Sequence, residues 1–317
     1  MHADVATAAN VEEPGSPAAA APLPLWRRLS FELIRTFLWG FARLFSLRGL
    51  YLFGQAFGTL EWLINYKRRG RFRKRLGLLL GDELSAGQRR AETRRFFMRT
   101  RCDKMFYLIL DKIPREQALA RLHYCGTEKI DQALAGGRGC FVAMSHHGTY
   151  HIGGMLMALR GYHVVGIRDP HEGGLRRFVQ EMYNRRYPEM QRLEMLYADT
   201  FPREIYRRFR RNYLVGAALD VHRSRGVNKR TQRVRVLGQE REFLVGTLLI
   251  ALRCGAGVLQ AFVISEPGFH YRLEILGPLV SEAGAGESPE VVSAAMQAYA
   301  RNLATFIRRD PNHISRA

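Results

Sequence analysis

The chain has 317 residues, and its 49 Lys and Arg against 29 Asp and Glu give a formal net charge of +20. A hydrophobic content of 47% and a charged content of 25% are typical of a globular protein, so a wholly disordered, collagen-like or multi-span membrane chain is excluded. The length suits one large domain or two small ones. The excess of positive charge indicates anionic partners, which include phospholipid head groups, phosphorylated substrates, acidic carrier proteins and nucleic acid.

Composition divides the chain into three regions. Residues 1–24 are rich in Ala and Pro and carry acids where a signal peptide would be basic, which predicts a disordered tail. Residues 25–118 read as a membrane-anchoring and helical region, and residues 119–317 as an α/β domain. Four widely spaced cysteines form no C-x-x-C pair, so we expect a reducing compartment and neither a disulfide framework nor a four-cysteine zinc site. These are Cys102, Cys125, Cys140 and Cys254.

The segment Phe31 to Leu47 is apolar except for a polar residue at every third or fourth position, which predicts a helix with one narrow polar stripe and a wide apolar face. Such a face lies in a membrane interface or packs on another helix. A membrane-spanning helix needs about 20 apolar residues, and a central Arg costs roughly 2.5–3.5 kcal/mol. Because Arg43 makes spanning marginal, we expect an interfacial anchor, with a tilted span and a soluble packed helix as the alternatives.

A basic run follows the second apolar stretch, Leu50 to Ile64. Basic clusters beside a membrane anchor gain about 1 kcal/mol per residue at an anionic surface, so the run supports membrane association. One aromatic residue interleaves it and no zinc-finger spacing accompanies it, so we expect no nucleic-acid partner. The run comprises Lys67, Arg68, Arg69, Arg71, Arg73, Lys74 and Arg75.

Two amphipathic helices are predicted over residues 84–120, the first beginning near Ser85. From about Gly126, short apolar runs alternate with helical patterns, which predicts an α/β fold with a mostly parallel sheet flanked by helices. Strands are expected at 139–145, 162–168, 193–199, 213–220 and 258–265, and helices at 173–186, 201–211 and 243–253. In such folds ligands bind at the carboxyl ends of the strands.

The segment at the end of the first of these strands runs from Ser145 to His151 and reads SHHGTYH. A His, a Gly two residues later and an aromatic residue two positions after that, all following an amphipathic anchor and a basic run, resemble the lauroyl/myristoyl acyltransferases of lipid A biosynthesis, within the lysophospholipid acyltransferase superfamily. The signature of that family is His-x4-Asp/Glu. His146, Gly148 and Tyr150 stand in register, and the resemblance covers roughly residues 30–315.

The last position of the motif departs from the family, because His151 stands where the family has its carboxylate. Arg168 ends the next strand, where the family has a Tyr-Arg pair. Asp220 ends a later strand, where the family often reads Asp-Gln-Asp; here the triplet ends in His222.

The resemblance implies that His146 is a general base, because a hydroxyl must lose its proton as it attacks a thioester carbonyl. A partner carboxylate would hold the imidazole in one tautomer and stabilise the imidazolium. His151 brings no negative charge, so either Asp220 or Asp169 supplies the carboxylate, the chemistry has changed, or the site is inactive. We therefore take His146, His151 and Asp220 as the candidate catalytic residues.

Substrate contacts are expected from Arg168, Gly148 and Tyr150, and from Arg223 and Arg225, which belong to a basic cluster that suits an acidic carrier protein or a phosphorylated glycolipid. Apolar side chains around 152–157 and 243–250 are expected to line an acyl channel. The resemblance implies no metal or organic cofactor.

Two other functions fit the same residues. His147, His151, Asp220 and His222 include common zinc ligands, and a four-residue spacing on a helix would place the first two on one face, as a metal-dependent hydrolase would need. The second alternative is a catalytically silent homologue that binds lipid.

Our interpretation is a membrane-associated acyltransferase at the cytoplasmic face of the inner membrane, with a monotopic or single-span anchor. It would transfer a fatty acyl chain from acyl carrier protein or acyl-coenzyme A to a hydroxyl of a glycolipid such as a lipid A precursor, or of a phospholipid.

Overall fold

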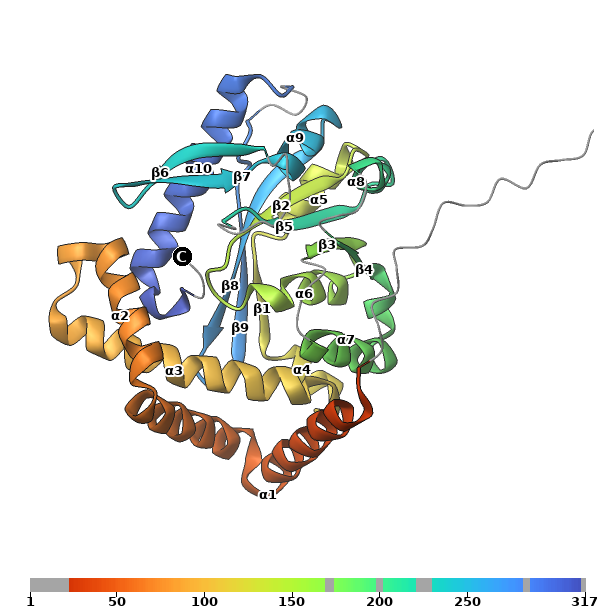
Figure 1. The fold of residues 1–317 in the computed structure, drawn as a ribbon. Helices are drawn as coiled ribbons and strands as arrows, with labels where there is room; N and C mark the ends of the chain where they lie inside the picture. Colours follow the sequence, from red (N-terminus) through yellow and green to blue (C-terminus); the bar gives the residue numbers. More distant parts are fainter. Residues whose placement is uncertain (1–22, 169–173, 198–201, 221–229, 282–285, 315–317) are drawn as a thin grey trace, which may run out of the picture.

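The computed structural model describes residues 23–168, 174–197, 202–220, 230–281 and 286–314 (Figure 1). It is an α/β structure built on a seven-stranded sheet with the order β1-β9-β8-β2-β5-β3-β4. Five neighbouring strands are parallel to one another, whereas β9 pairs antiparallel to β8 and β1 pairs parallel to β9. The mostly parallel sheet predicted from the sequence is confirmed. The strands are β1 (Leu122–Cys125), β2 (Cys140–Met144), β3 (Val164–Arg168), β4 (Leu193–Tyr197), β5 (Leu214–Ala218), β8 (Gly257–Glu266) and β9 (His270–Leu276).

Helices cover both faces of the sheet, so its central strands are apolar on both sides, as in β2, where every residue is buried. One face packs against α5 (Glu128–Ala135), α6 (Gly153–Leu159) and α7 (Gly174–Arg186). The other packs against α8 (Pro202–Arg210), α9 (Gly246–Arg253) and α10 (Pro289–Arg309). Short 3₁₀ turns connect several of these elements at Gly81–Glu83, Leu110–Lys112, Tyr150–Ile152, Pro188–Arg192 and Pro311–His313.

A two-stranded hairpin of β6 (Thr231–Val236) and β7 (Gln239–Leu244) packs on α10 (Figure 1). The sequence patterns predicted neither this hairpin nor β1 and β9, and the helix expected from residue 243 begins at Gly246. The hairpin has one exposed face rich in Arg and Glu, so its strands lack the continuous apolar run by which a buried strand is recognised.

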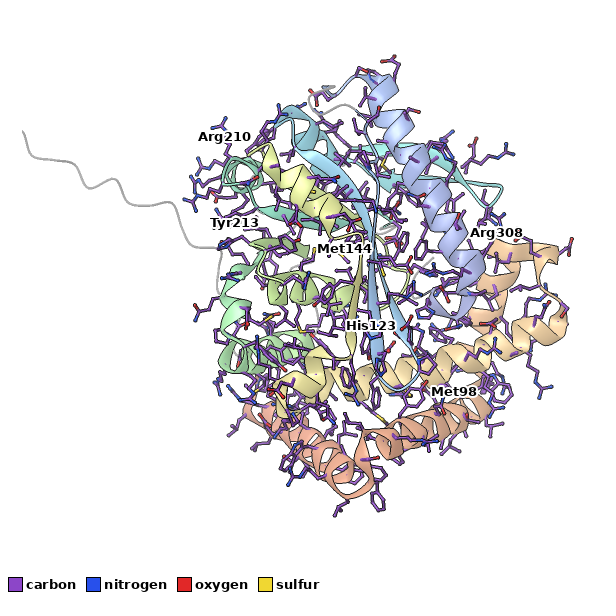
Figure 2. The ribbon with its side chains drawn as sticks, turned by 180° about the vertical axis from the view of Figure 1, so that it is seen from behind. Met98, His123, Met144, Arg210, Tyr213 and Arg308 are labelled. Carbon is purple, nitrogen blue, oxygen red and sulfur yellow. The ribbon has the colours of Figure 1, made fainter. Side chains whose placement is uncertain are left out.

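The N-terminal helices pack across the end of the sheet where β8 ends (Figure 1). They are α1 (Leu25–Ile64), α2 (Tyr66–Leu80), α3 (Ala86–Ile109) and the short α4 (Arg115–Leu119). Ser85 caps α3 through a capping box with Gln88, which confirms the predicted start. Gly58 of α1 lies against the backbone of Met98 in α3, so close that an added Cβ would lie 2.5 Å from the Met98 Cα. Met98 is labelled in Figure 2.

Helix α1 buries Arg35 of its predicted polar stripe together with the apolar Leu38, whereas Thr36, Arg43 and Ser46 of the stripe are exposed, so the stripe does not face the protein as a whole. Arg35 is buried, donates to the carbonyl of Leu108 at 2.8 Å and pairs with Asp111 at 2.5 Å. Ser46 has non-helical dihedral angles (φ 63°, ψ 170°), so the two apolar stretches form one kinked helix. Large apolar side chains are exposed along both halves, including Leu33, Phe37, Leu44, Phe45, Leu52, Leu60 and Leu63. Within the described residues, no helix is both long enough and apolar enough to cross a membrane.

Candidate active site

The order of the strands brings His146 and Asp220 together. β2 and β5 are neighbours and run parallel, so both end at the same edge of the sheet, and each of the two residues follows the end of its strand. The pairing continues one step beyond the strands, where the Leu219 N–H donates to the Met144 carbonyl at 3.1 Å. Residues 74 positions apart in the sequence therefore lie side by side.

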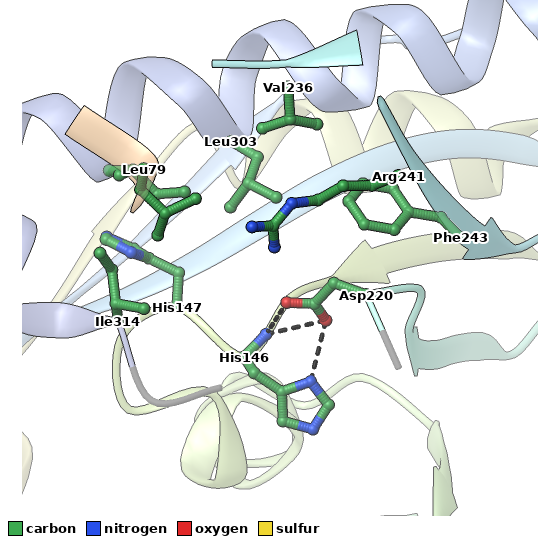
Figure 3. Close-up of a pocket in the computed structure, with 10 residues that line it drawn as sticks. Leu79, His146, His147, Asp220, Val236, Arg241, Phe243, Leu303 and Ile314 are labelled. Atoms are coloured by element: carbon green, nitrogen blue, oxygen red, sulfur yellow. Dashed lines mark hydrogen bonds and ion pairs between the residues drawn. The ribbon is translucent and has the colours of Figure 1, made fainter. Parts of the chain in front are cut away.

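Three short contacts join the two residues (Figure 3). The backbone N–H of His146 lies 3.0 Å from Oδ1 and 2.8 Å from Oδ2 of Asp220, and its Nδ1 lies 2.9 Å from Oδ1. The two side chains are 7% and 10% exposed. Because a carboxylate only accepts hydrogen bonds, Nδ1 carries a proton in this pair, and in the neutral imidazole Nε2 then keeps a lone pair that can accept one.

Gly148 fixes the loop that follows His146. Its φ is +79°, and a Cβ there would lie 2.1 Å from the carbonyl oxygen of Val263. Its N–H donates to the carbonyl of His313 at 2.8 Å. Gly148 thus has a backbone role here, because only glycine allows both the positive φ and the close approach to β8.

A buried polar network that the sequence patterns did not reveal holds the next residue. The hydroxyl of Thr149 donates to Asp103 of α3 at 3.1 Å and accepts from Ser265. Asp103 also accepts from Tyr271 and from Arg99, so its charge is paired. This network joins α3, the loop after β2, and the neighbouring strands β8 and β9. No sequence pattern indicated it, because its members come from three segments that lie far apart in the chain.

His147 points away from the dyad. It is buried against Phe262, Phe306 and His313, and neither of its ring nitrogens makes a hydrogen bond. Burial, then the charges of Arg99 and Arg309, lower its pKa to about 3. His147 is therefore a neutral packing residue.

His151 lies beside Tyr107 and Tyr150, with ring centroids 5.0 and 5.9 Å away. Burial is the largest cause that lowers its pKa to about 3, and the charges of Arg176, Arg99, Arg168 and Lys104 act in the same direction. A neutral imidazole in these surroundings supplies no charge to His146. Tyr150 stands between the two histidines in the sequence, and its ring centroid lies 4.7 Å from that of His146. Its hydroxyl accepts a hydrogen bond from Arg176 at 3.1 Å.

Other predicted site residues fall in different places. Arg168 is the last residue of β3, and its positive charge is one of those that lower the pKa of His151. Asp169, His222, Arg223 and Arg225 lie outside the described residues.

Of the proposed metal ligands, His147 and His151 do not share a helix face. Residues 147–149 are not helical, and the turn at Gly148 sends His147 towards α10 and His151 towards α3. In the part of the chain that the structure describes, no group of three His, Cys, Asp or Glu side chains is placed to hold a metal ion.

A pocket lies next to the dyad, on the side of Asp220 that faces the hairpin (Figure 3). Apolar side chains from α2, the hairpin, α10 and the C-terminal segment line it together with His146, His147, Asp220 and Arg241: Leu79, Val236, Phe243, Leu303, Ile307 and Ile314. Of the two segments expected to line an acyl channel, 243–250 contributes Phe243. The apolar residues of 152–157 instead pack in the core between the sheet, α7 and neighbouring turns.

Residues 28–313 match the family model of the bacterial lipid A biosynthesis acyltransferases. The chain belongs to this family. The match spans nearly all of α1, the other N-terminal helices and the whole sheet, in agreement with the resemblance seen in the motif. A comparison with curated proteins found no match. Within this acyltransferase family, the chain keeps the histidine of the motif, has a histidine at the acidic position, and places the carboxylate of Asp220 on the imidazole.

Proposed function

We propose that this protein transfers a fatty acyl chain from a carrier thioester to a hydroxyl of a glycolipid, with His146 as the general base and Asp220 as its orienting carboxylate. The observation that carries the proposal is the hydrogen bond between Nδ1 of His146 and Asp220. The end of β5 thus provides the carboxylate that the family motif provides five residues after the His.

The chemistry follows from the tautomer. Nε2 of His146 accepts the proton of the acceptor hydroxyl as that oxygen attacks the thioester carbonyl. The tetrahedral intermediate collapses with cleavage of the C–S bond, and the imidazolium returns the proton to the leaving thiolate. Asp220 stabilises the imidazolium while it exists, and the return of the proton leaves the enzyme unchanged.

The outer surface of α1 supports a site of action at a membrane. Its exposed Leu, Phe and Trp side chains would meet acyl chains, and the basic residues of α2 adjoin them, as suits an anionic bilayer. A lipid acceptor would then be presented beside the helices that pack on the site. Because carrier thioesters are cytoplasmic compounds, we infer the cytoplasmic face of the inner membrane.

The test is acyl transfer by the full-length protein in vesicles that contain anionic phospholipid. Acyl carrier protein and coenzyme A thioesters are offered in separate reactions, with phosphorylated glycolipid, unphosphorylated glycolipid and lysophospholipid as acceptors. We expect one glycolipid to gain an acyl ester and His146→Ala to abolish the gain.

His123→Ala is the matched control, because His123 lies on β1 at the edge of the sheet, beside His270 (Figure 2). It should keep full activity. A wild-type protein that acylates none of these acceptors, or equal activity in wild type and His146→Ala, would contradict the proposal.

A further inference from the structure

Arg241 occupies an unusual position in the hairpin. Residues paired directly across an antiparallel ladder share a face, and Arg241 is paired with Val234. The same face carries Val236 and Phe243, both buried, whereas Arg233 and Arg235 lie on the exposed face. A cation on the inward face loses hydration, so it needs compensation from the protein.

The side chain of Arg241 extends into the pocket behind the dyad, towards Asp220 (Figure 3). Its Nη2 donates to Oε1 of Gln239 at 3.0 Å, which holds the guanidinium in place from within the same strand. Burial lowers the pKa of Arg241, and the carboxylate of Asp220 acts in the opposite direction. The carboxylate therefore compensates for part of the lost hydration.

Two other groups near Asp220, His146 and Tyr299, do not neutralise the charge of its carboxylate. A general base must be neutral to accept a proton, so in the proposed mechanism His146 offers Asp220 no positive charge before the reaction. Tyr299 of α10 also lies near Asp220, but burial raises its pKa well above the ordinary value and its hydroxyl donates to Met144. Arg75 of α2 lies one helical turn before the pocket residue Leu79 and close enough to Arg241 for the two charges to repel.

We propose that Arg241 is a positioning residue for the reaction, the counter-ion that holds the Asp220 carboxylate in place so that it can orient His146. This inference rests on the proposed function of the dyad. Arg241, supplied by the hairpin, would be a third member of the arrangement and would act on His146 through Asp220. The guanidinium acts through Asp220 and touches no reacting atom.

The experiment compares Arg241→Gln, Arg241→Lys and Arg241→Ala with wild type in the acyl-transfer assay. We expect kcat to fall roughly 10–100-fold in Arg241→Gln, because a charge is lost beside a buried carboxylate, while KM stays within about twofold. Lys, which keeps the charge, should restore most of kcat. Added guanidinium ion should partly rescue Arg241→Ala. Arg235→Gln, which removes the same charge from the exposed face of the hairpin, should behave as wild type.

A second readout needs no catalysis. In the full-length protein labelled with ¹⁵N-histidine, the Nδ1–H resonance of His146, identified by its loss in His146→Gln, should be protected from exchange in wild type and Arg241→Lys and exchange faster in Arg241→Gln. Unchanged exchange in Arg241→Gln would overturn the proposal, and so would equal losses of kcat in the Gln and Lys variants. If the wild type transfers no acyl group at all, the proposed function fails, and the exchange measurement still decides the role of Arg241.

Discussion

Asp220 accepts two hydrogen bonds from the same residue, one from the backbone N–H of His146 and one from its Nδ1. The first contact fixes the carboxylate relative to the main chain and the second fixes the ring relative to the carboxylate. The orientation of the imidazole is thus built into the junction of β2 and β5.

Replacing Asp220 should therefore harm acyl transfer far more than replacing His151. We expect Asp220→Asn to lower kcat by roughly 10²–10⁴, because an amide cannot stabilise the imidazolium and permits the wrong tautomer. His151→Gln should retain activity within about tenfold, since its ring is neutral and lies against tyrosines. Steady-state kinetics on both variants measures the difference, and a larger loss in His151→Gln would assign the essential partner to His151.

The low pKa of His151 also predicts the pH dependence of the rate. With a pKa of about 3, the ring binds no proton as pH falls from 9 to 5, so it contributes no step to the rate profile there. The profiles of wild type and His151→Gln should have the same shape. A limb near neutral pH that disappears in His151→Gln would show that this histidine titrates in the working enzyme.

His147 should make the fold sensitive to acid. Its pKa is about 3 in the folded protein against 6.5 for the free side chain, so between these values the unfolded chain binds more protons. Stability at neutral pH is unaffected and is then lost as pH falls below about 6.5, by up to about 1.4 kcal/mol per pH unit for this group.

Because neither ring nitrogen of His147 is hydrogen-bonded, His147→Phe should keep the packing and reduce this loss. Denaturant unfolding of both proteins from pH 7.5 to pH 4.5 gives the comparison. His313, whose pKa is also lowered, is present in both and cancels to first order. Parallel stability curves for the two proteins would contradict the prediction.

The ion pair between Arg35 and Asp111 should hold α1 on the protein. Arg35 is 2% exposed, so Asp111→Ala would leave the buried guanidinium of Arg35 without its carboxylate partner. We expect this to lower the free energy of unfolding by about 3–5 kcal/mol. Glu32→Ala removes a partner that is 40% exposed and should cost about 0–1 kcal/mol. Similar losses in the two variants would show that the buried contact is not the anchor of the helix.

Membrane binding should depend on the outward face of α1. Leu33→Glu combined with Phe37→Glu removes two exposed apolar side chains, each worth about 1.5–3 kcal/mol when buried, so partitioning into anionic vesicles should fall at least about tenfold. Point substitutions suit this test better than removal of residues 1–48, because Arg35 and Leu38 belong to the buried interior. Ser293→Glu with Thr305→Glu, on the exposed side of α10, adds the same charge and should leave binding nearly unchanged.

Local patterns in the sequence were enough for the elements whose signal is periodic or continuous. The buried run of β2 and the capping box at Ser85 each follow from side chains within one segment. The same holds for the position of His146 at the end of a strand and for the kinship to the acyltransferase family.

Only the tertiary structure decided which residues meet. The sequence left Asp220 and Asp169 as possible sources of the carboxylate, and the parallel pairing of β2 with β5 brings Asp220 to the imidazole from 74 residues away. The turn at Gly148 separates His147 from His151, and the hairpin brings Arg241 into the pocket that Asp220 also lines. Strand order and the turn at a glycine with positive φ arise from the packing of the whole chain, so a local pattern specifies the chemical groups that are present and packing selects the ones that act together.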